Sequence, residues 1–456
     1  MKTLLCGLIA ALLTLTRIPT SSGEEQPASS PPTPAAPTLS LPECIDLALK
    51  QNPSVLKAQE ELRRTRGLIV EARAPALPQL NATGSYRRIE KRFIDQFPGT
   101  TTGPTANQQE PWSDTVELSQ LVYAGGRVNA ALRAAKLTDQ IAALNFQRVV
   151  ADTILSVRKA FYQILLNKAL VGVREQSVHL LEEQLQDTRH RFDVGAVPRF
   201  NVLRAEVELA NAKPPLIRAQ SDLRLSRESL VKLLAIDARE KRQDFTPINF
   251  TGELTYEQRS WSLDDALTQA LVRRPEYQQA EKQVGLARES VRVATTGYKP
   301  EVKIFGDYGL ANTTFGNKVD QTKHGWTAGT TASWALFDGM LTLGQVRQAR
   351  AKLAESELDY ADARRSIELE VRQAYSDYLQ ALELIEASKK TVEQGEESLR
   401  LAEARFRAGT GTQLDVLSAQ TALTDARSNE IQALHDYNVA LATLERVTGL
   451  TVKLAP

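Results

Sequence analysis

The chain has 456 residues, of which 42% are hydrophobic and 24% are charged, ordinary values for a folded protein. Its 56 basic and 55 acidic side chains leave a formal net charge of +1 and form no polybasic block, which argues against a nucleic-acid partner. After the N-terminal apolar run, no stretch offers the roughly 18 uncharged apolar residues that a membrane-spanning helix needs.

The first residues have the pattern of an export signal. Lys2 provides a positive start, the apolar run over residues 4–15 is too short to cross a bilayer, and small residues follow at positions 21–23. We therefore predict that residues 1–23 are a signal peptide and that the mature chain is exported.

A Pro-rich segment separates this signal from the rest of the chain. Residues 24–40 are rich in Pro, Ser and Ala and are expected to be a disordered or extended linker. Cys6 lies too early in the apolar run for a lipoprotein anchor. Only Cys44 would remain after signal cleavage, so an intrachain disulfide is excluded.

The remaining chain is a tandem repeat. The segment LPECIDLALKQNP, which ends at Pro53, returns as LDDALTQALVRRP, which ends at Pro275, at an offset of 222 positions. From Gly125 onward the offset is 214, and chance matches do not keep one offset over such a length. We predict two structural repeats, residues 41–260 and 261–456, each with a short helix, a medium helix, two strands and two long helices.

Apolar residues recur every seven positions in the long helical segments, which keeps one apolar seam facing a partner helix and predicts a coiled-coil arrangement. Helices of roughly 65 residues would be on the order of 100 Å long, a length typical of a rod or tunnel. The seams are Val157, Ile164, Val171, Val178, Leu185 and Phe192 in the first repeat, and Val371, Tyr378, Ile385, Val392, Leu399 and Phe406 in the second. The expected long helices cover about 127–192, 199–234, 341–407 and 413–447.

One segment departs from the repeat. Lys213-Pro214-Pro215 falls inside a predicted long helix, where the second repeat has Arg427-Ser428-Asn429. An interior proline costs a helix about 3 kcal/mol. We therefore predict that the helix bends or breaks near Pro214.

Two pairs of alternating segments predict membrane-type strands. Val302, Ile304 and Tyr308 alternate with Lys303 and Asp307, so an apolar face would contact lipid while a mostly polar face would line a lumen. A soluble pair of hairpins packed on helices is the alternative. The predicted strands cover about 79–88 and 113–123 in the first repeat, and about 301–310 and 325–337 in the second.

The last predicted strand carries two tryptophans. Trp326 and Trp334 lie eight positions apart, on one face near opposite strand ends, as aromatic residues at two lipid interfaces would. Four strands cannot close a barrel, and open sheet edges are not tolerated in lipid. Three copies would supply twelve strands, so we expect a trimer.

Motifs at the ends of the long segments indicate a family. The paired segments RFDVGAVPRFNVL (191–203) and RFRAGTGTQLDVL (405–417) lie where an outgoing helix turns back. LVYAGGR (121–127) and ALFDGM (335–340) lie where a strand passes into a helix. With these motifs, the chain from about Leu41 to Leu450 resembles the TolC-like outer-membrane efflux protein family, the outer membrane factors.

The resemblance implies a mixed α and β membrane protein: a homotrimer with a twelve-stranded β-barrel in the lipid of the outer membrane, continued into a long α-helical coiled-coil tunnel in the periplasm. It also implies a closed tip that an inner-membrane pump (RND or ABC type) and a periplasmic adaptor, or membrane fusion protein, open. The adaptor would dock at the hairpin tips, which comprise Arg191, Phe192 and Gly195 and their counterparts Arg405, Phe406 and Gly409.

The resemblance also implies a periplasmic gate. It places Asp415 near the narrow end of the tunnel, where family members carry acidic rings, and three copies would bring three carboxylates together. Ser418 stands where a second acidic ring is expected, and Asn201 is the uncharged counterpart in the first repeat. The alternative is that Asp415 caps its helix by accepting a hydrogen bond from the backbone N–H of Thr412.

No catalytic, cofactor or metal site is expected. The four histidines, at positions 179, 190, 324 and 435, form no ligand pattern, and no nucleophile elbow or Walker motif is present. Gly125-Gly126 is interpreted as a hinge between barrel and tunnel. We predict a passive exit duct for efflux or type I secretion and not an enzyme; the alternative is a periplasmic coiled-coil adaptor or scaffold without a barrel.

Overall fold

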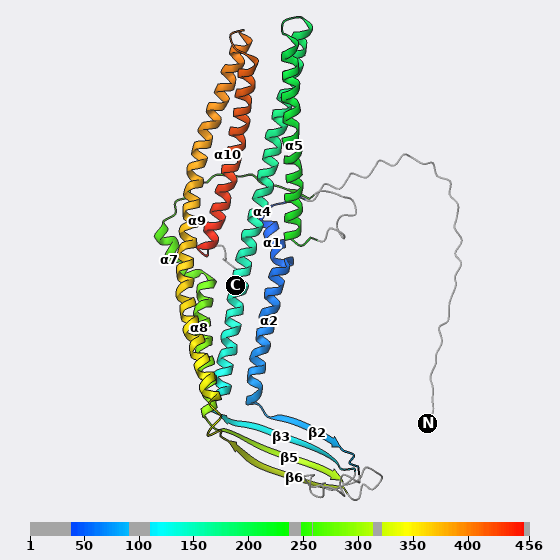
Figure 1. Ribbon diagram of the computed structural model, residues 1–456, viewed down its shortest axis with the longest axis vertical. Helices are drawn as coiled ribbons and strands as arrows, with labels where there is room; N and C mark the ends of the chain where they lie inside the picture. The colour runs from blue at the N-terminus through cyan, green and yellow to red at the C-terminus, as the bar shows by residue number, and fades with distance from the viewer. Residues whose placement is uncertain (1–37, 91–109, 237–247, 258, 313–321, 451–456) are drawn as a thin grey trace, which may run out of the picture.

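The computed structural model describes residues 38–90, 110–236, 248–257, 259–312 and 322–450. The predicted signal peptide, residues 1–23, and all but the last three residues of the predicted linker lie outside the described residues. Long helices run side by side along the longest axis and meet a four-stranded sheet at one end (Figure 1).

The first repeat begins with two capped helices. Ser40 starts α1 through a capping box in which its backbone N–H and its hydroxyl both donate to Glu43 Oε2, each at 2.7 Å. Asn52 separates α1 from α2, accepting from Ser54 N and donating to the carbonyl of Leu233, both at 2.8 Å. The elements are β1 (Thr38–Leu39), α1 (Leu41–Gln51), α2 (Pro53–Arg73), the 3-10 turn η1 (Ala74–Ala76), β2 (Gln79–Tyr86), β3 (Trp112–Ala124), α4 (Arg127–Asp193) and α5 (Arg199–Leu233).

The second repeat has the same element order. It is preceded by the short strand β4, at the end of the first repeat, which pairs in parallel with β1 and so ties the chain that leads into the second repeat to the start of the first one. The elements are β4 (Asn249–Phe250), α7 (Leu263–Arg273), α8 (Pro275–Thr295), the 3-10 turn η2 (Thr296–Tyr298), β5 (Glu301–Asn312), β6 (Lys323–Ser333), α9 (Leu341–Arg407) and α10 (Gln413–Val447).

The long helices of the two repeats match in length and position. Helices α4 and α9 each contain 67 residues, and α5 and α10 each contain 35. All four begin and end at the offset of 214 positions seen in the sequence. The repeat in the sequence is therefore a repeat in structure.

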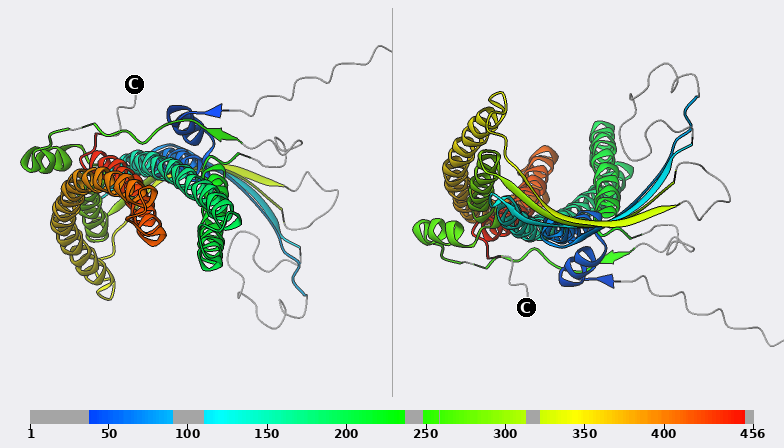
Figure 2. Two further views of the ribbon diagram at one scale, coloured as in Figure 1. Left: turned by 90° about the horizontal axis from the view of Figure 1, so that it is seen from above. Right: turned by 90° about the horizontal axis from the view of Figure 1, so that it is seen from below.

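The heptad positions form the contacts between helices. Val157, Ile164 and Val371 are at most 1% exposed, because each lies in the apolar core of its own repeat. Within the described ranges, each helix is too short or too polar to span a membrane. Seen along the long axis, the helices form an open arc (Figure 2).

The sheet has the strand order β2-β3-β5-β6 and is antiparallel throughout. Its register sorts the residues by face, since Leu80, Leu118, Gly306 and Ala328 lie in one row across the strands. The next row on the same face is Ala82, Val116, Tyr308 and Trp326, and a row on the opposite face is Asn81, Glu117, Asp307 and Thr327. One face is therefore apolar and exposed, with Leu80 69% and Leu118 52% exposed, while the other is polar.

The last strand is shorter than the sequence predicted. The prediction was 325–337, whereas β6 covers Lys323–Ser333 and Trp334 lies beyond its end. The indole N–H of Trp334 donates to the carbonyl of Tyr298 at 3.1 Å, which fixes this residue at the junction between sheet and helices. Residue types keep alternating beyond Ser333, but the strand ends there. Ser333 pairs with Glu301, the first residue of β5, so no further partner is available.

Helix α5 continues through both prolines, so the predicted break is not present. Pro214 and Pro215 cannot donate to the carbonyls of Ala210 and Asn211 four residues earlier. Both of these residues are exposed, so water can bond to the two carbonyls. The helix therefore tolerates prolines at a level where its backbone faces solvent.

Candidate functional site

The two hairpin tips have the same backbone geometry. Gly195 and Gly409 adopt positive φ angles of 78° and 74°, in the left-handed region that favours glycine. The N–H of Gly195 donates to the carbonyl of Phe192 at 2.8 Å, and that of Gly409 to the carbonyl of Phe406 at 3.1 Å. These bonds end the outgoing helices and turn the chain back.

The two tips also contact each other. The guanidinium carbon of Arg191 lies 5.1 Å from the centroid of the Phe406 ring, a cation–π contact. Nearby, the side-chain amide of Gln413 donates to the hydroxyl of Thr188 at 3.3 Å, and both residues are buried. A groove of about 380 Å³ lies between the hairpins here, with Arg191 and Phe406 in its lining. Two of the residues predicted for docking thus pack together within the chain.

Asp415 caps helix α10. Its Oδ2 accepts from the backbone N–H and from the hydroxyl of Thr412, both at 2.8 Å. The N–H of Asp415 donates back to the Thr412 hydroxyl at 3.3 Å, which completes the capping box. Hydrogen bonds from the backbone and side chain of Thr412, with a smaller effect of Arg405, lower the pKa of Asp415. The carboxylate is therefore ionised at neutral pH and remains exposed.

The other two predicted gate residues lie near this cap or its counterpart. The hydroxyl of Ser418 donates to the carbonyl of Asp415 at 3.0 Å, and Ser418 shares the exposed face of α10. The backbone N–H of Asn201 donates to the carbonyl of Pro198 at 3.0 Å in the first turn of α5. Pro198 occupies the position of Thr412, so the first repeat has no hydroxyl at its cap.

Glycines make the junction between sheet and helices. Gly125 and Gly126 have φ angles of 63° and 92°, and at the equivalent point Gly339 and Met340 have 67° and 70°. A Cβ on Gly125 would lie 2.8 Å from the Cβ of Lys299, so the close approach of these segments requires glycine. The chain thus turns sharply between β3 and α4, and again between β6 and α9.

Of the two predicted interface tryptophans, only Trp326 lies on a strand. Its position opposite Tyr308 places it on the apolar face, where it is 78% exposed. Trp334 is 57% exposed and bonds to the junction as described above. Trp326 is therefore the fourth residue of β6, and Trp334 lies at the boundary between sheet and helices.

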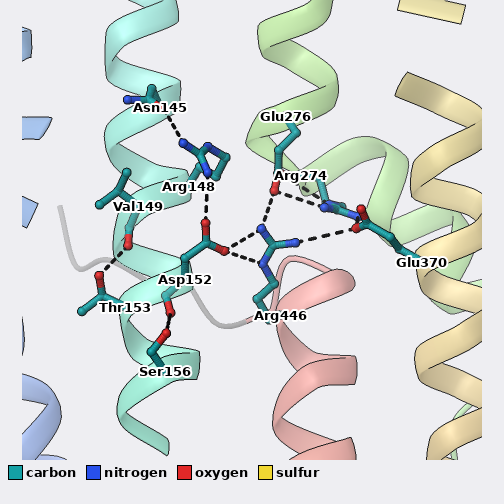
Figure 3. Close-up of polar contacts among 10 residues, drawn as sticks. All are labelled: Asn145, Arg148, Val149, Asp152, Thr153, Ser156, Arg274, Glu276, Glu370 and Arg446. Carbon is teal, nitrogen blue, oxygen red and sulfur yellow. Dashed lines mark hydrogen bonds and ion pairs between the residues drawn. The ribbon is translucent and has the colours of Figure 1, made fainter. Parts of the chain in front are cut away.

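An ionic cluster joins the two repeats where the start of α8 and the end of α10 meet the middle parts of α4 and α9 (Figure 3). Arg446 of α10 pairs with Asp152 of α4 at 2.6 Å and with Glu276 of α8 at 2.7 Å. Arg274, whose side chain is 3% exposed, pairs with Glu276 at 3.1 Å and with Glu370 of α9 at 2.6 Å. The cluster therefore ties α4 of the first repeat to three helices of the second.

Charges within this ionic cluster stabilise one another. Burial raises the pKa of Glu276, but the hydrogen bond and charge of Arg274 and the charge of Arg446 outweigh it and keep the pKa below its ordinary value of 4.5. Sequence reasoning missed the cluster, because its members lie on four helices. The one available signal was Arg274 at the position of Asn52, a basic residue just before a helix where the first repeat has a neutral cap.

In the described ranges, no group of three or more His, Cys, Asp or Glu side chains is placed so that it could hold a metal ion. His435 contacts Asp436 at 2.9 Å, and His324 contacts the Tyr308 hydroxyl at 3.2 Å. These contacts are pairwise and lie on different elements.

Comparisons with known proteins match this architecture. Residues 44–235 and 266–450 match the family described as "Outer membrane efflux protein". Outer membrane protein TolC of Escherichia coli (strain K12) is 25% identical over 420 residues, covering 87% of this chain and 80% of TolC. The alkaline protease secretion protein AprF of Pseudomonas aeruginosa is 24% identical over 419 residues, covering 89% and 83%.

A solved structure has the same fold. The Campylobacter jejuni CmeC outer membrane channel superposes with a TM-score of 0.78 at 15% identity, covering 91% of this chain and 87% of CmeC. The family match covers each repeat from its first helix to the end of its last one. The chain belongs to the outer membrane efflux protein family.

Proposed function

We propose that this protein is the outer-membrane exit duct of an efflux pump or type I secretion system, a passive conduit that contributes no catalysis. The observation that carries the proposal is a four-stranded sheet with one exposed apolar face, joined through glycine turns to helices of 67 residues. At about 1.5 Å per residue these helices extend roughly 100 Å, a length that suits a tunnel through the periplasm.

The sheet supports a trimeric assembly. Strands β2 and β6 lie at its edges, and a sheet edge in lipid leaves backbone groups without hydrogen bonds. Three copies joined edge to edge would give a closed barrel of twelve strands, with the apolar rows toward lipid and the row containing Glu117 and Asp307 toward the lumen. The open arc of helices supports the same assembly, because three arcs can close into a tunnel.

A periplasmic adaptor or coiled-coil scaffold without a barrel is the alternative. It would share the export signal and the heptads, but a sheet with an exposed apolar face would be a liability in water. The test is migration of outer-membrane fractions on a gel with and without heating. A heat-sensitive trimer supports the duct, and a monomer in the soluble periplasmic fraction would overturn it.

We further propose that the periplasmic adaptor of an RND- or ABC-type pump docks at the tips around Gly195 and Gly409. A Cβ added at either glycine would meet no atom within 4 Å, so the backbone there is open to a partner. Gly409→Phe should abolish efflux while trimers still reach the outer membrane. Gly126→Phe, also at a positive φ in open space but far from the tips, controls for backbone strain. Normal efflux by a Gly409→Phe trimer would contradict docking there.

The gate proposal is compatible with the helix cap at Asp415. Both bonds from Thr412 end on Oδ2, so Oδ1 can face a lumen while the cap is intact. Three such carboxylates would attract cations and exclude anions. Single-channel recording of Asp415→Asn should show weaker cation preference and weaker block by divalent cations. Asp425→Asn, at an exposed aspartate about three turns further along α10, is the control, and a loss of thermal stability with unchanged conductance would leave Asp415 with the capping role alone.

A further inference from the structure

We propose that Arg405 of one copy stacks on Phe192 of the neighbouring copy. The tips of the trimer would then be joined by the same arginine–aromatic contact that joins the two hairpins inside each chain. The inference rests on the proposed trimer and identifies residues that hold its periplasmic end together.

Each hairpin tip contributes only one residue of its Arg-Phe pair to the contact inside the chain. Arg191-Phe192 and Arg405-Phe406 occupy equivalent positions at the ends of α4 and α9. The contact inside the chain takes the arginine of the first hairpin and the phenylalanine of the second. What remains is the phenylalanine of the first hairpin and the arginine of the second, the same complementary pair on the outer flanks of the chain.

Both remaining side chains are accessible. Phe192 is 40% exposed, although it continues an apolar seam whose preceding member, Leu185, is 7% exposed. Arg405 is exposed as well. In the part of the chain that the structure describes, Phe192 has no aromatic or cationic partner and Arg405 lies over no ring.

The flank of α9 near the tip is uncovered in the same way. In α4, Val178 and Leu185 are 9% and 7% exposed, because α10 packs on this helix in addition to α5. The equivalent residues of α9, Val392 and Leu399, are only half-buried. Since α5 is the counterpart of α10, the helix that would cover this flank of α9 is α5 of a second copy.

Charges are compatible with this pairing. In the groove inside the chain Arg191 pairs with Asp187 at 2.9 Å, while Glu183 on α4 and Glu403 on α9 are like charges. The equivalent positions between copies hold Glu397 and Arg189, which are opposite charges. Arg191 and Arg407, which line the groove inside the chain, are also like charges. At the equivalent positions between copies stand Arg405 and Asp193, which are opposite charges. A groove between copies would thus be complementary at both pairs of positions.

Cysteine cross-linking in assembled outer-membrane protein tests the contact. A short bismaleimide added to Phe192→Cys/Arg405→Cys should give covalent dimers and trimers on a denaturing gel. The matched variant Arg191→Cys/Phe406→Cys should remain at the position of the monomer, because its two thiols lie in one chain. Cys44 is fully buried and does not compete for the reagent, and each single variant controls for background.

Each outcome decides one of the two proposals. Unheated samples first establish whether each variant forms trimers. A trimer in which Phe192→Cys/Arg405→Cys yields no covalent dimer, while the internal pair reacts within the monomer, overturns this inference and leaves the duct intact. Wild-type protein that never migrates as a trimer overturns the proposed function itself.

Discussion

The two repeats have the same backbone but carry different polar residues. Asn52 and Arg274 occupy equivalent positions before a helix, and both are buried, at 5% and 3% exposed. Asn52 bonds to the carbonyl of Leu233 in its own repeat, whereas Arg274 joins an ionic cluster that reaches α4 of the other repeat. Apolar periodicity therefore sets the fold of each repeat, while the residues at polar positions determine how the repeats are joined.

Removal of Arg274 should have the largest effect on stability. Arg274→Met leaves Glu276 and Glu370 with fewer cationic partners in a partly buried cluster, and breaking such a pair costs about 3 kcal/mol or more. Thermal unfolding of the purified protein measures the loss. Arg64→Met removes an exposed partner of Glu61 and should cost less than about 1 kcal/mol. Equal unfolding midpoints for the two variants would mean that the cluster does not stabilise the contact between repeats.

The exposed apolar face of the sheet is a feature that both repeats share. Ile304→Arg places a charge on the proposed lipid face and should cost about 2–4 kcal/mol near the bilayer midplane. Its counterpart in the first repeat, Ala82→Arg, should behave in the same way. Thr327→Arg on the polar face is the control. The amount of heat-sensitive trimer in the outer membrane is the readout, and a loss confined to Thr327→Arg would reverse the two faces.

Replacement of the proline pair in α5 tests the largest backbone difference between the repeats. Replacing Pro214-Pro215 by Ser-Asn, the residues at the equivalent positions 428–429, restores two backbone donors to α5. We expect a gain of about 1 kcal/mol, less than the full helix penalty of proline because exposed carbonyls are already hydrated. Hydrogen exchange across residues 210–216 should slow in the variant. The reverse exchange in α10 is the matched control and should destabilise the protein.

Protonation of Glu276 at low pH should have the smallest effect on stability. The pKa of Glu276 lies below 4.5, so its ionised form is favoured in the folded chain and its contribution is present above about pH 4.5. This contribution is lost as the pH falls through the folded pKa. Glu276→Gln should therefore reduce the difference in thermal midpoint between pH 7 and pH 4, whereas Glu71→Gln on an exposed helix face should preserve it. An unchanged pH dependence in Glu276→Gln would exclude this carboxylate as a source of acid sensitivity.

The repeat and the helices could be predicted from the amino-acid sequence alone. The period of seven and the glycines at 195 and 409 predicted helix ends within about one residue, because burial of a seam and a left-handed turn are local requirements. The sequence also predicted the alternating faces of the strands, since the period of two is local as well. The strand end was missed at Ser333, because pairing with β5 and not residue alternation ends β6.

The contacts between helices of the two repeats, in contrast, depend on the tertiary structure. The cluster around Arg274 and Arg446 brings together side chains from four helices, and no spacing along the chain encodes such a contact. The continuity of α5 through Pro214 depended on solvent access to Ala210 and Asn211, which the sequence does not specify. In the same way, the contact of Arg191 with Phe406 follows from the packing of α10 on α4, so that one residue of each Arg-Phe motif became internal while Phe192 and Arg405 remained exposed.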